Sequence, residues 1–515
     1  MSMVKKYYKL GLILFIISAI SYAMMMLNSA TNSIDSIWHG VMANSGEWEI
    51  VTGRWFWYIS DRLQFIICSD PVTSLFAISK YVISVILIID VFCRCESKIL
   101  TVIIGLISLV SVSVCSELGF RFQFNAFGFA VLFAVAAFWI STKYVNRFAD
   151  ISIVLLIVLS LGSYQNDIGI ICLLVCLYVM RMIIKNEDTL KILKYIGRML
   201  IDGILGCVLY LIILKLFLFG FNYQELDYRG QTSFDIFEFI YLLPERICKT
   251  YSVIWNYFNE LPIDGVVLYI TPLGVFGKVL YTISWVLIGI FLIYEFVKII
   301  KTHDITKIVL YLCMIILLPI ATNIILLVAD TQLSSYMTLN ILYLYVVLLF
   351  MSISILDHKS YKIVVGIILG IICYSQFYMV QYDQTAMVEG KEFVSEFVTQ
   401  ISSKLYDIDD LDKKQIVLIG SPAESPMFNK QIFDKANIYA QYGFFYMQEC
   451  WDGWFGKLNH LNVNIADKNV WSEVKDDVMS DNKDHQLFPH KDSIEIRDDL
   501  IIIYISKVSD KSYWN

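Results

Sequence analysis

The 515-residue chain has little charge and little proline. Charged residues make up 17% of it, against about a quarter in a typical soluble domain. Hydrophobic residues make up 57%, and the mean hydropathy is +0.64. These values exclude an ordinary soluble protein and indicate that lipid is the main solvent. The sequence also has no basic stripe and no nucleic-acid-binding motif, so no nucleic-acid partner is expected.

Several motifs of catalysis and metal binding are missing. The sequence has no glycine-rich phosphate loop, no Gly-x-Ser-x-Gly elbow and no His-Glu-x-x-His pair. No Asp-x-Asp pair falls in a predicted cytoplasmic loop, which argues against a nucleotide-sugar enzyme working from inside. The 11 cysteines are scattered, and no His/Cys spacing resembles a zinc site. We therefore expect no metal and no other cofactor.

Long apolar stretches, separated by short charged runs, dominate the first three quarters of the chain. Each is about 17–25 residues long, enough to cross a hydrocarbon core of about 30 Å. We expect eleven membrane helices, near residues 8–27, 71–93, 99–116, 126–142, 150–164, 167–184, 199–220, 274–298, 306–328, 337–356 and 362–381. The predicted fold class is mainly α, a polytopic membrane domain over residues 1–381.

Lysine and arginine concentrate in one set of loops, which the positive-inside rule assigns to the cytoplasm. The N-terminus is then inside, the first helix is an uncleaved anchor, and the long loops 28–70 and 221–273 face outward. Within the second loop, residues 234–243 and 253–258 mix aromatic and polar side chains at helical spacing, as helices in a membrane interface do.

Residues 382–515 are richer in charge and predict a small α/β domain outside the membrane. We expect a helix over 388–405, a strand over 415–420 and a hairpin-like or edge strand over 500–506. The aromatic residues Trp451, Trp454 and Trp471 suit either sugar stacking in acceptor recognition or an ordinary core.

The first outer loop holds the main candidate for catalysis. Asp35 follows the first helix, whose end can fix its position, and Trp38 and His39 come directly after it. A carboxylate at the membrane face can take a proton from a sugar hydroxyl beside a lipid-linked donor. The alternative is an aromatic belt with solvated charges, which is common at membrane interfaces.

Arg54 follows Gly53 and precedes Trp55 in the same loop. A guanidinium beside a large aromatic side chain suits a phosphate or a sugar face. A salt bridge from Arg54 to Glu47 or Glu49 at the rim of the loop would give the same pattern.

Two lysines fall inside expected membrane helices, where each costs about 2.5–3.5 kcal/mol on insertion scales. Lys80 lies about ten residues into its helix, and Lys215 lies about one turn from the outer end of its own. Either could hold the phosphate of a lipid-linked substrate. Snorkelling to the interface would also explain Lys215, and a buried pair with Glu117 would also explain Lys80.

Two short outer turns carry further polar groups. Glu117 and Arg121 lie in the turn over residues 116–125, and Tyr164 and Gln165 lie in the turn over residues 164–167. The first turn can supply a second carboxylate, and the second is rich in groups that bind sugars. Plain polar connectors would have the same composition.

The order of these motifs resembles the serotype-converting O-antigen glucosyltransferases of Gtr type II and their bacterial relatives, which have the GT-C architecture. The matching segments are Ile34-Asp-Ser36, Gly53-Arg-Trp55, Leu161-Gly-Ser-Tyr-Gln165 and Ile416-Val-Leu-Ile-Gly420. Relatives typically carry an acidic pair after the first helix, whereas here Ser36 follows Asp35. They often carry an arginine early in a late membrane helix, and residues 335–340 contain none, so anion binding would rest on Lys80, Lys215 or Arg54.

The resemblance implies a bacterial cytoplasmic-membrane glycosyltransferase. It would move a sugar, glucose by analogy, from undecaprenyl phosphate to a cell-surface polysaccharide or lipid-linked glycan on the outer face. Asp35 would act as the general base, and Glu117 is the first choice for a second carboxylate. The rival hypothesis is a transporter or flippase of a lipid-linked sugar. Transporters often have internal repeats and helices broken by glycine or proline, whereas this chain shows no repeat and has 8 prolines.

Overall fold

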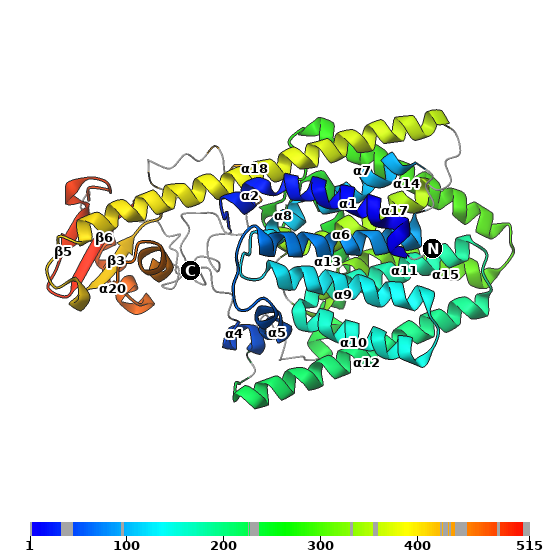
Figure 1. The fold of residues 1–515 in the computed structure, drawn as a ribbon, viewed down its shortest axis with the longest axis horizontal. Coiled ribbons are helices and arrows are strands. Elements are labelled where there is room, and N and C mark those ends of the chain that lie inside the picture. The colour runs from blue at the N-terminus through cyan, green and yellow to red at the C-terminus, as the bar shows by residue number, and fades with distance from the viewer. Residues whose placement is uncertain are drawn as a thin grey trace. The chain divides into compact units, whose positions relative to one another are not determined.

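The computed structural model describes residues 3–31, 45–93, 97–224, 226, 236–329, 333–353, 359–422, 425, 431, 434–437, 451–480 and 485–507. It is mainly helical (Figure 1). The chain divides into two compact units. The helical unit comprises Met1–Ala23, Asn44–Glu117 and Gln123–Gln381, and the C-terminal unit comprises Met24–Ala43, Leu118–Phe122 and Tyr382–Asn515.

A helix lies at each of the eleven positions expected from the sequence. They are α1 (Met3–Ser21), α6 (Val72–Phe92), α7 (Lys98–Leu109) with α8 (Val112–Leu118), α9 (Phe124–Lys143), α10 (Arg147–Ser163), α11 (Ile168–Ile184), α12 (Thr189–Phe221), α14 (Val275–Ile300), α15 (Ile305–Thr322), α17 (Leu339–Ile353) and α18 (Lys359–Leu405). Within the described ranges, seven helices are long and apolar enough to cross a membrane, or eight if α7 and α8, bent by 48°, form one span. The chain is thus a helical membrane protein, and eleven crossings stay a prediction.

The long helices pack side by side around a buried centre. Helix α9 lies between α6 and α10, and α12 packs against α10 (Figure 1). All 15 residues of α17 are buried. A helix that is apolar on every side is stable only inside a large bundle or a membrane, so α17 forms part of the core of the helical unit.

An acidic residue inside the second expected membrane helix is explained by its partners. Asp90 forms ion pairs with Lys143 at 2.7 Å and with Lys6 at 3.3 Å. It also accepts hydrogen bonds of 3.0 Å from the Tyr7 hydroxyl and the Trp139 indole N–H. Asp90 therefore links the C-terminal end of α6 to α1 and α9, next to loops that are predicted to be cytoplasmic.

The two long loops that are predicted to face outward contain helices of their own. In the first loop, α4 (Glu47–Val51) and α5 (Phe56–Leu63) follow each other closely. In the second, a single helix, α13 (Ile236–Asn259), replaces the two interfacial pieces expected over 234–243 and 253–258, and Pro244 lies within it. A hairpin of β1 (Pro262–Ile263) and β2 (Val266–Val267) follows. Short helical elements complete the described chain, namely α2 (Ala23–Leu27), η1 (Gln165–Asp167), α16 (Ile325–Val328), η2 (Ser335–Met337), η3 (Leu411–Lys413), η6 (Gly453–Leu458), α20 (Lys468–Ser480) and η7 (Lys491–Ser493).

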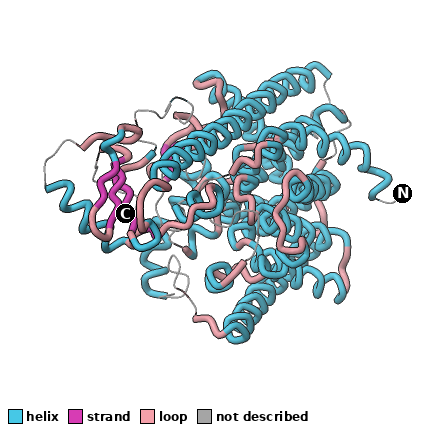
Figure 2. Tube along the Cα trace, turned by 60° about the vertical axis from the view of Figure 1, so that its left-hand side comes forward, coloured by secondary structure: helices cyan, strands magenta, loops and turns pink. Residues whose placement is uncertain are grey.

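The C-terminal unit contains a four-stranded sheet, magenta in Figure 2. Its strands are β3 (Gln415–Ile419), β4 (Asn464–Ile465), β5 (Ile494–Ile496) and β6 (Leu500–Tyr504), in the order β4-β3-β6-β5. Both strands predicted from the sequence are present. The edge position is wrong, because β6 pairs in parallel with β3 on one side and forms a hairpin with β5 on the other. The helix expected over 388–405 is the last part of α18.

The tryptophans of the C-terminal unit belong to its core. Trp451, Trp454 and Trp471 have exposed fractions of 1%, 0% and 5%. The Trp471 indole N–H donates to the Leu418 carbonyl on β3 at 2.9 Å. A ring with so little exposed surface cannot stack on a sugar from solvent, so the alternative of ordinary core aromatics holds for these three residues.

Candidate active site

Two carboxyl groups, Glu117 on α8 and Asp167 in η1, are buried together inside the helical unit. Neither has any exposed surface, and they are close enough to repel each other electrostatically. The Tyr81 hydroxyl donates to Glu117 Oε2. Among the described residues, Glu117 Oε1 and both Asp167 oxygens have no partner of good hydrogen-bond geometry, although the Asn166 amide lies near Asp167. We call Glu117 and Asp167 the acid pair.

An unpaired buried acceptor costs about 1–3 kcal/mol, and more when it is charged. No lysine or arginine that the structure describes forms a salt bridge with either acid. Folding gains nothing from such an arrangement, and unsatisfied carboxylates of this kind are typical of functional sites.

Glu117 is held by the break between α7 and α8. The Tyr22 hydroxyl donates to the Leu109 carbonyl at 2.9 Å and accepts from the Ser111 N–H at 3.3 Å, so it satisfies backbone groups that the break exposes. On α8, the Ser113 hydroxyl bonds to that of Thr338 and the Ser116 hydroxyl to that of Ser335, both at 2.6 Å. These bonds fix the helix that carries Glu117 against the segment before α17.

Asp167 is held by two asparagines. The Asn340 amide donates to the Asn166 carbonyl at 3.0 Å and to the Thr322 carbonyl at 3.2 Å. The Asn166 amide donates to the Met337 carbonyl at 3.3 Å. Gly169 permits this close approach, because a Cβ there would lie 2.6 Å from the Asn340 amide nitrogen. The same segment, residues 335–340, therefore positions both members of the acid pair.

Two of the motifs that carry the family resemblance, Gly53-Arg54 and Tyr164-Gln165, are in contact. Gly53 adopts φ +85°, and a side chain there would collide with the Tyr210 hydroxyl and the Gln165 amide. The Gln165 amide donates to the Thr52 carbonyl at 2.9 Å, and Tyr210 donates to the Gly53 carbonyl at 3.1 Å. Gly53 is thus a position that only glycine can fill, and it locks the Arg54 backbone against the 164–165 turn.

Arg54 lies over two aromatic rings. Its guanidinium carbon is 5.0 Å from the centre of the Trp57 ring and 5.8 Å from that of Tyr164, within the range of a cation–π contact. Its Nε is buried without a partner, and no ion pair to the described residues satisfies it. The alternative of a rim salt bridge is not observed: Glu49 instead accepts from the Gly46 N–H at 2.7 Å.

Tyr164 connects the cation to the acid pair. Its buried side chain lies within electrostatic range of Arg54, Asp167 and Glu117. The site therefore brings a positive group and a pair of acids to the same aromatic side chain. Such a site can stabilise a reaction in which opposite charges develop on neighbouring atoms.

Lys80 lies in a separate polar cluster. Its ammonium donates to the Asn125 side-chain oxygen and, at 3.2 Å, to the Phe76 carbonyl, and it lies 4.2 Å from the centre of the Phe129 ring. Asn125 in turn donates to Gln64 at 3.0 Å. The predicted alternative, a Lys80–Glu117 pair, is not seen, since Glu117 bonds to Tyr81 instead. Lys80 thus remains a buried cation without an acidic partner among the described residues.

The other residues predicted from the sequence stand as follows. Lys215 is exposed on α12, as snorkelling predicts. Arg121 is half-buried and belongs to the C-terminal unit. Asp35, Trp38 and His39 lie outside the described residues.

Sequence reasoning missed Asp167 and Tyr81. Asp167 is the last residue of the polar turn after α10. The surrounding sequence gives no reason to assign it a functional role in preference to Asn166. Tyr81 follows Lys80, and a hydroxyl in an apolar helix gives no sign of the residue that it contacts. No group of three or more metal-ligand side chains occurs in the described part of the chain.

The fold and site define a helical membrane protein with a buried acid pair beside an unpaired guanidinium. The family model described as Glucosyl transferase GtrII matches residues 24–356. Because this is more than half of the chain, the protein belongs to the GtrII glucosyl transferase family, as the order of its motifs predicted. Comparison with curated proteins and with solved structures gave no match.

Proposed function

We propose that this glycosyltransferase takes its sugar, expected to be glucose, from undecaprenyl phosphate. It delivers the sugar to a hydroxyl of a cell-surface polysaccharide or lipid-linked glycan on the outer face of a bacterial cytoplasmic membrane. Membership of the GtrII family supports the transfer. The observation that carries the chemistry is the acid pair, buried and largely unpaired next to Tyr164 and Arg54.

The acid pair suits the charge that develops on the sugar. Cleavage of a glycosyl–phosphate bond leaves positive charge on the anomeric carbon and ring oxygen, as in other oxocarbenium-like transition states. Fixed carboxylates in a site without water stabilise this charge without reorganising. Glu117 and Asp167 then act electrostatically, which requires no exposed surface in the resting protein.

Arg54 suits the leaving phosphate. Its guanidinium can donate two parallel hydrogen bonds to phosphate oxygens, and it has no competing acid among its described neighbours. Lys80 is the second candidate cation. With two cations to offset the leaving charge, we propose that transfer needs no metal.

Asp35 is proposed as the general base. It takes the proton of the acceptor hydroxyl as that oxygen bonds to the anomeric carbon and the phosphate oxygen departs with the bonding electrons. A single displacement of this kind inverts the anomeric centre. The C-terminal unit is proposed to face the acceptor outside the membrane, with the N-terminus inside.

The test is transfer by the purified protein in lipid nanodiscs, supplied with an undecaprenyl-phosphate sugar and the host polysaccharide. Transfer without any nucleotide sugar, with an inverted anomeric configuration by NMR, is expected. Transfer that requires a nucleotide sugar would refute the donor assignment.

The Asp35→Asn variant tests the base. General-base assistance is worth about 10²–10⁴-fold, so a loss of at least 10²-fold in kcat is expected. Glu47→Gln is the matched control, because Glu47 is an exposed acid of the same loop. A wild-type rate for Asp35→Asn at normal expression would remove Asp35 from the mechanism.

A further inference from the structure

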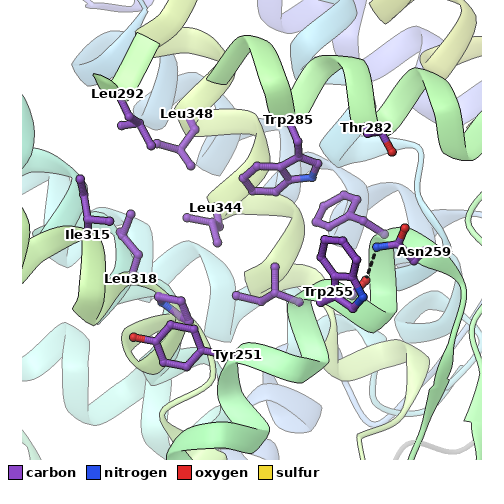
Figure 3. Close-up of a pocket in the computed structure, with 13 residues that line it drawn as sticks. Tyr251, Trp255, Asn259, Thr282, Trp285, Leu292, Ile315, Leu318, Leu344 and Leu348 are labelled. Atoms are coloured by element: carbon purple, nitrogen blue, oxygen red, sulfur yellow. Dashed lines mark hydrogen bonds between the residues drawn. The ribbon is translucent and has the colours of Figure 1, made fainter. Parts of the chain in front are cut away.

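A groove lies among α13, α14, α15 and α17 in the helical unit (Figure 3). Its volume is about 390 Å³, which falls among small-molecule sites of about 300–1,000 Å³. Its walls are almost entirely hydrocarbon and aromatic, with Trp255 and Trp285 toward one end and Leu344, Leu348 and Leu292 toward the other (Figure 3). No step of the mechanism above uses this groove.

The groove is shaped by a proline in a membrane helix. Pro319 lies within α15, and its ring removes the N–H that would bond to the Ile315 carbonyl four residues earlier. Both residues line the groove. The next carbonyl, that of Ile316, accepts from the Tyr251 hydroxyl at 2.5 Å. The backbone is thus rearranged, and its polar groups partly satisfied, where the groove is formed.

The groove is accessible from the lipid. Helices α14 and α15 are candidate membrane spans, and most of their surface is not covered by the rest of the chain. Next to the groove, Ile316 is 59% exposed and Val286 is 55% exposed. A hydrocarbon chain can therefore enter sideways from the bilayer without crossing water.

The groove has one polar end. Asn259 and Thr282 lie together at that end, and the Trp285 indole nitrogen faces it (Figure 3). This nitrogen is buried and has no hydrogen-bond partner in the described chain. One turn from Thr282, Lys278 pairs with Glu260 at 3.3 Å. Because α14 begins on the outer side in the predicted topology, the polar end belongs to the outer face.

The polar end lies close to the acid pair. At the end of α13, Phe258 lines the groove, while the side chain of the preceding Tyr257 is buried near the Ser113–Thr338 pair. Ser113 lies one turn before Glu117 on α8. A single helix, about 10 Å across, therefore separates the groove from the site.

We propose that this groove holds the isoprenoid chain of the lipid-phosphate donor, with the chain leaving the groove past Asn259, where α13 ends, so that its phosphate lies outside the groove at the site described above. This proposal rests on the proposed function, and it adds the position of the donor's lipid chain. An apolar groove open to the bilayer matches a branched hydrocarbon chain. The polar groups of Asn259 and Thr282 and the unpaired Trp285 N–H mark the end of the groove from which the chain would pass to its polar head.

The proposal is tested by filling the groove with a larger side chain on α15. Ile315→Trp places a large side chain inside it, and Ile316→Trp is the matched control, because the neighbouring side chain faces outward. With an undecaprenyl-phosphate sugar, Ile315→Trp should raise KM by about tenfold, the effect of excluding about two methylene groups from apolar contact. With a short-chain donor, KM should change less than about twofold, and kcat should stay at the wild-type value. Equal KM changes for both donors, or for both variants, would overturn the proposal.

A binding measurement needs no transfer. Native mass spectrometry of the wild-type protein should show undecaprenyl monophosphate bound, and Ile315→Trp should lose it while Ile316→Trp keeps it. If transfer is absent but this pattern appears, the proposed function fails and the groove assignment stands. A bilayer phospholipid that undecaprenyl phosphate does not displace would overturn the groove assignment.

Discussion

Replacing Glu117 with glutamine should raise stability and lower activity at the same time. Glutamine keeps an oxygen for the Tyr81 hydroxyl and offers an N–H₂ group toward Asp167, whose oxygens lack good partners in the described structure. A hydrogen bond to a charged group contributes about 1.5–3 kcal/mol. The unfavourable proximity of two buried carboxyl groups is also relieved. We expect the melting temperature to rise by about 1–3 °C.

The same variant loses half of the charge proposed to stabilise the transition state. Removing one fixed electrostatic group from an active site typically lowers kcat by about 10²–10³-fold. The assay is transfer from an undecaprenyl-phosphate sugar in nanodiscs, with thermal unfolding of the same samples followed by tryptophan fluorescence.

Glu295→Gln is the matched control. Glu295 is also a buried glutamate on a membrane helix, with an exposed fraction of 2%, but it pairs with Lys298 at 3.2 Å. This variant should lose stability and keep its kcat. A Glu117→Gln protein that melts lower than wild type, or transfers at the wild-type rate, would refute the assignment of the acid pair.

Further predictions concern the first loop, the cations and metal dependence. Gly53→Ala should cost at least about 1–2 kcal/mol, because alanine is strained at φ +85°, and an unchanged melting temperature would contradict the packing described. Burial raises the pKa of Asp61 to about 6, so the folded protein binds the extra proton between about pH 4 and 6. Stability should therefore fall as pH rises through that window, by about 3 kcal/mol, and pH-dependent melting of Asp61→Asn should lack this component. Lys80→Gln should raise the donor KM at least about fivefold while Lys215→Gln leaves it within about twofold, and similar effects of both would indicate a general role of charge. Transfer should persist in excess EDTA, and a loss that Mg²⁺ or Mn²⁺ restores would show that a metal is needed.

The helices could be predicted from the sequence because a lipid bilayer requires long apolar stretches in any chain that crosses it. A chain must supply about 20 apolar residues to cross a bilayer, and each such stretch is a helix in the structure. Helix ends were less predictable. The stretch after residue 381 was expected to begin a new helix, yet α18 continues to Leu405, because nothing between the two segments breaks a helix.

The candidate site was predictable in part. Glu117 was proposed from its polar turn, and Gly53-Arg54 and Tyr164-Gln165 were singled out by the resemblance; the structure places these two motifs in contact through Tyr210. The partnership of Glu117 with Asp167 was not foreseen. It depends on the Asn166–Asn340 bond between residues 174 positions apart, and periodicity along the chain carries no information about such contacts. For the same reason, the alternative prediction of a Lys80–Glu117 pair was wrong, and Lys80 contacts Asn125 instead.

The most direct test of the account follows radiolabelled sugar in proteoliposomes loaded with undecaprenyl-phosphate sugar and polysaccharide acceptor. The account predicts that the label moves to the polysaccharide and that one undecaprenyl phosphate is released for each sugar transferred. Label that stays on the lipid and only changes leaflet would contradict it and identify a flippase.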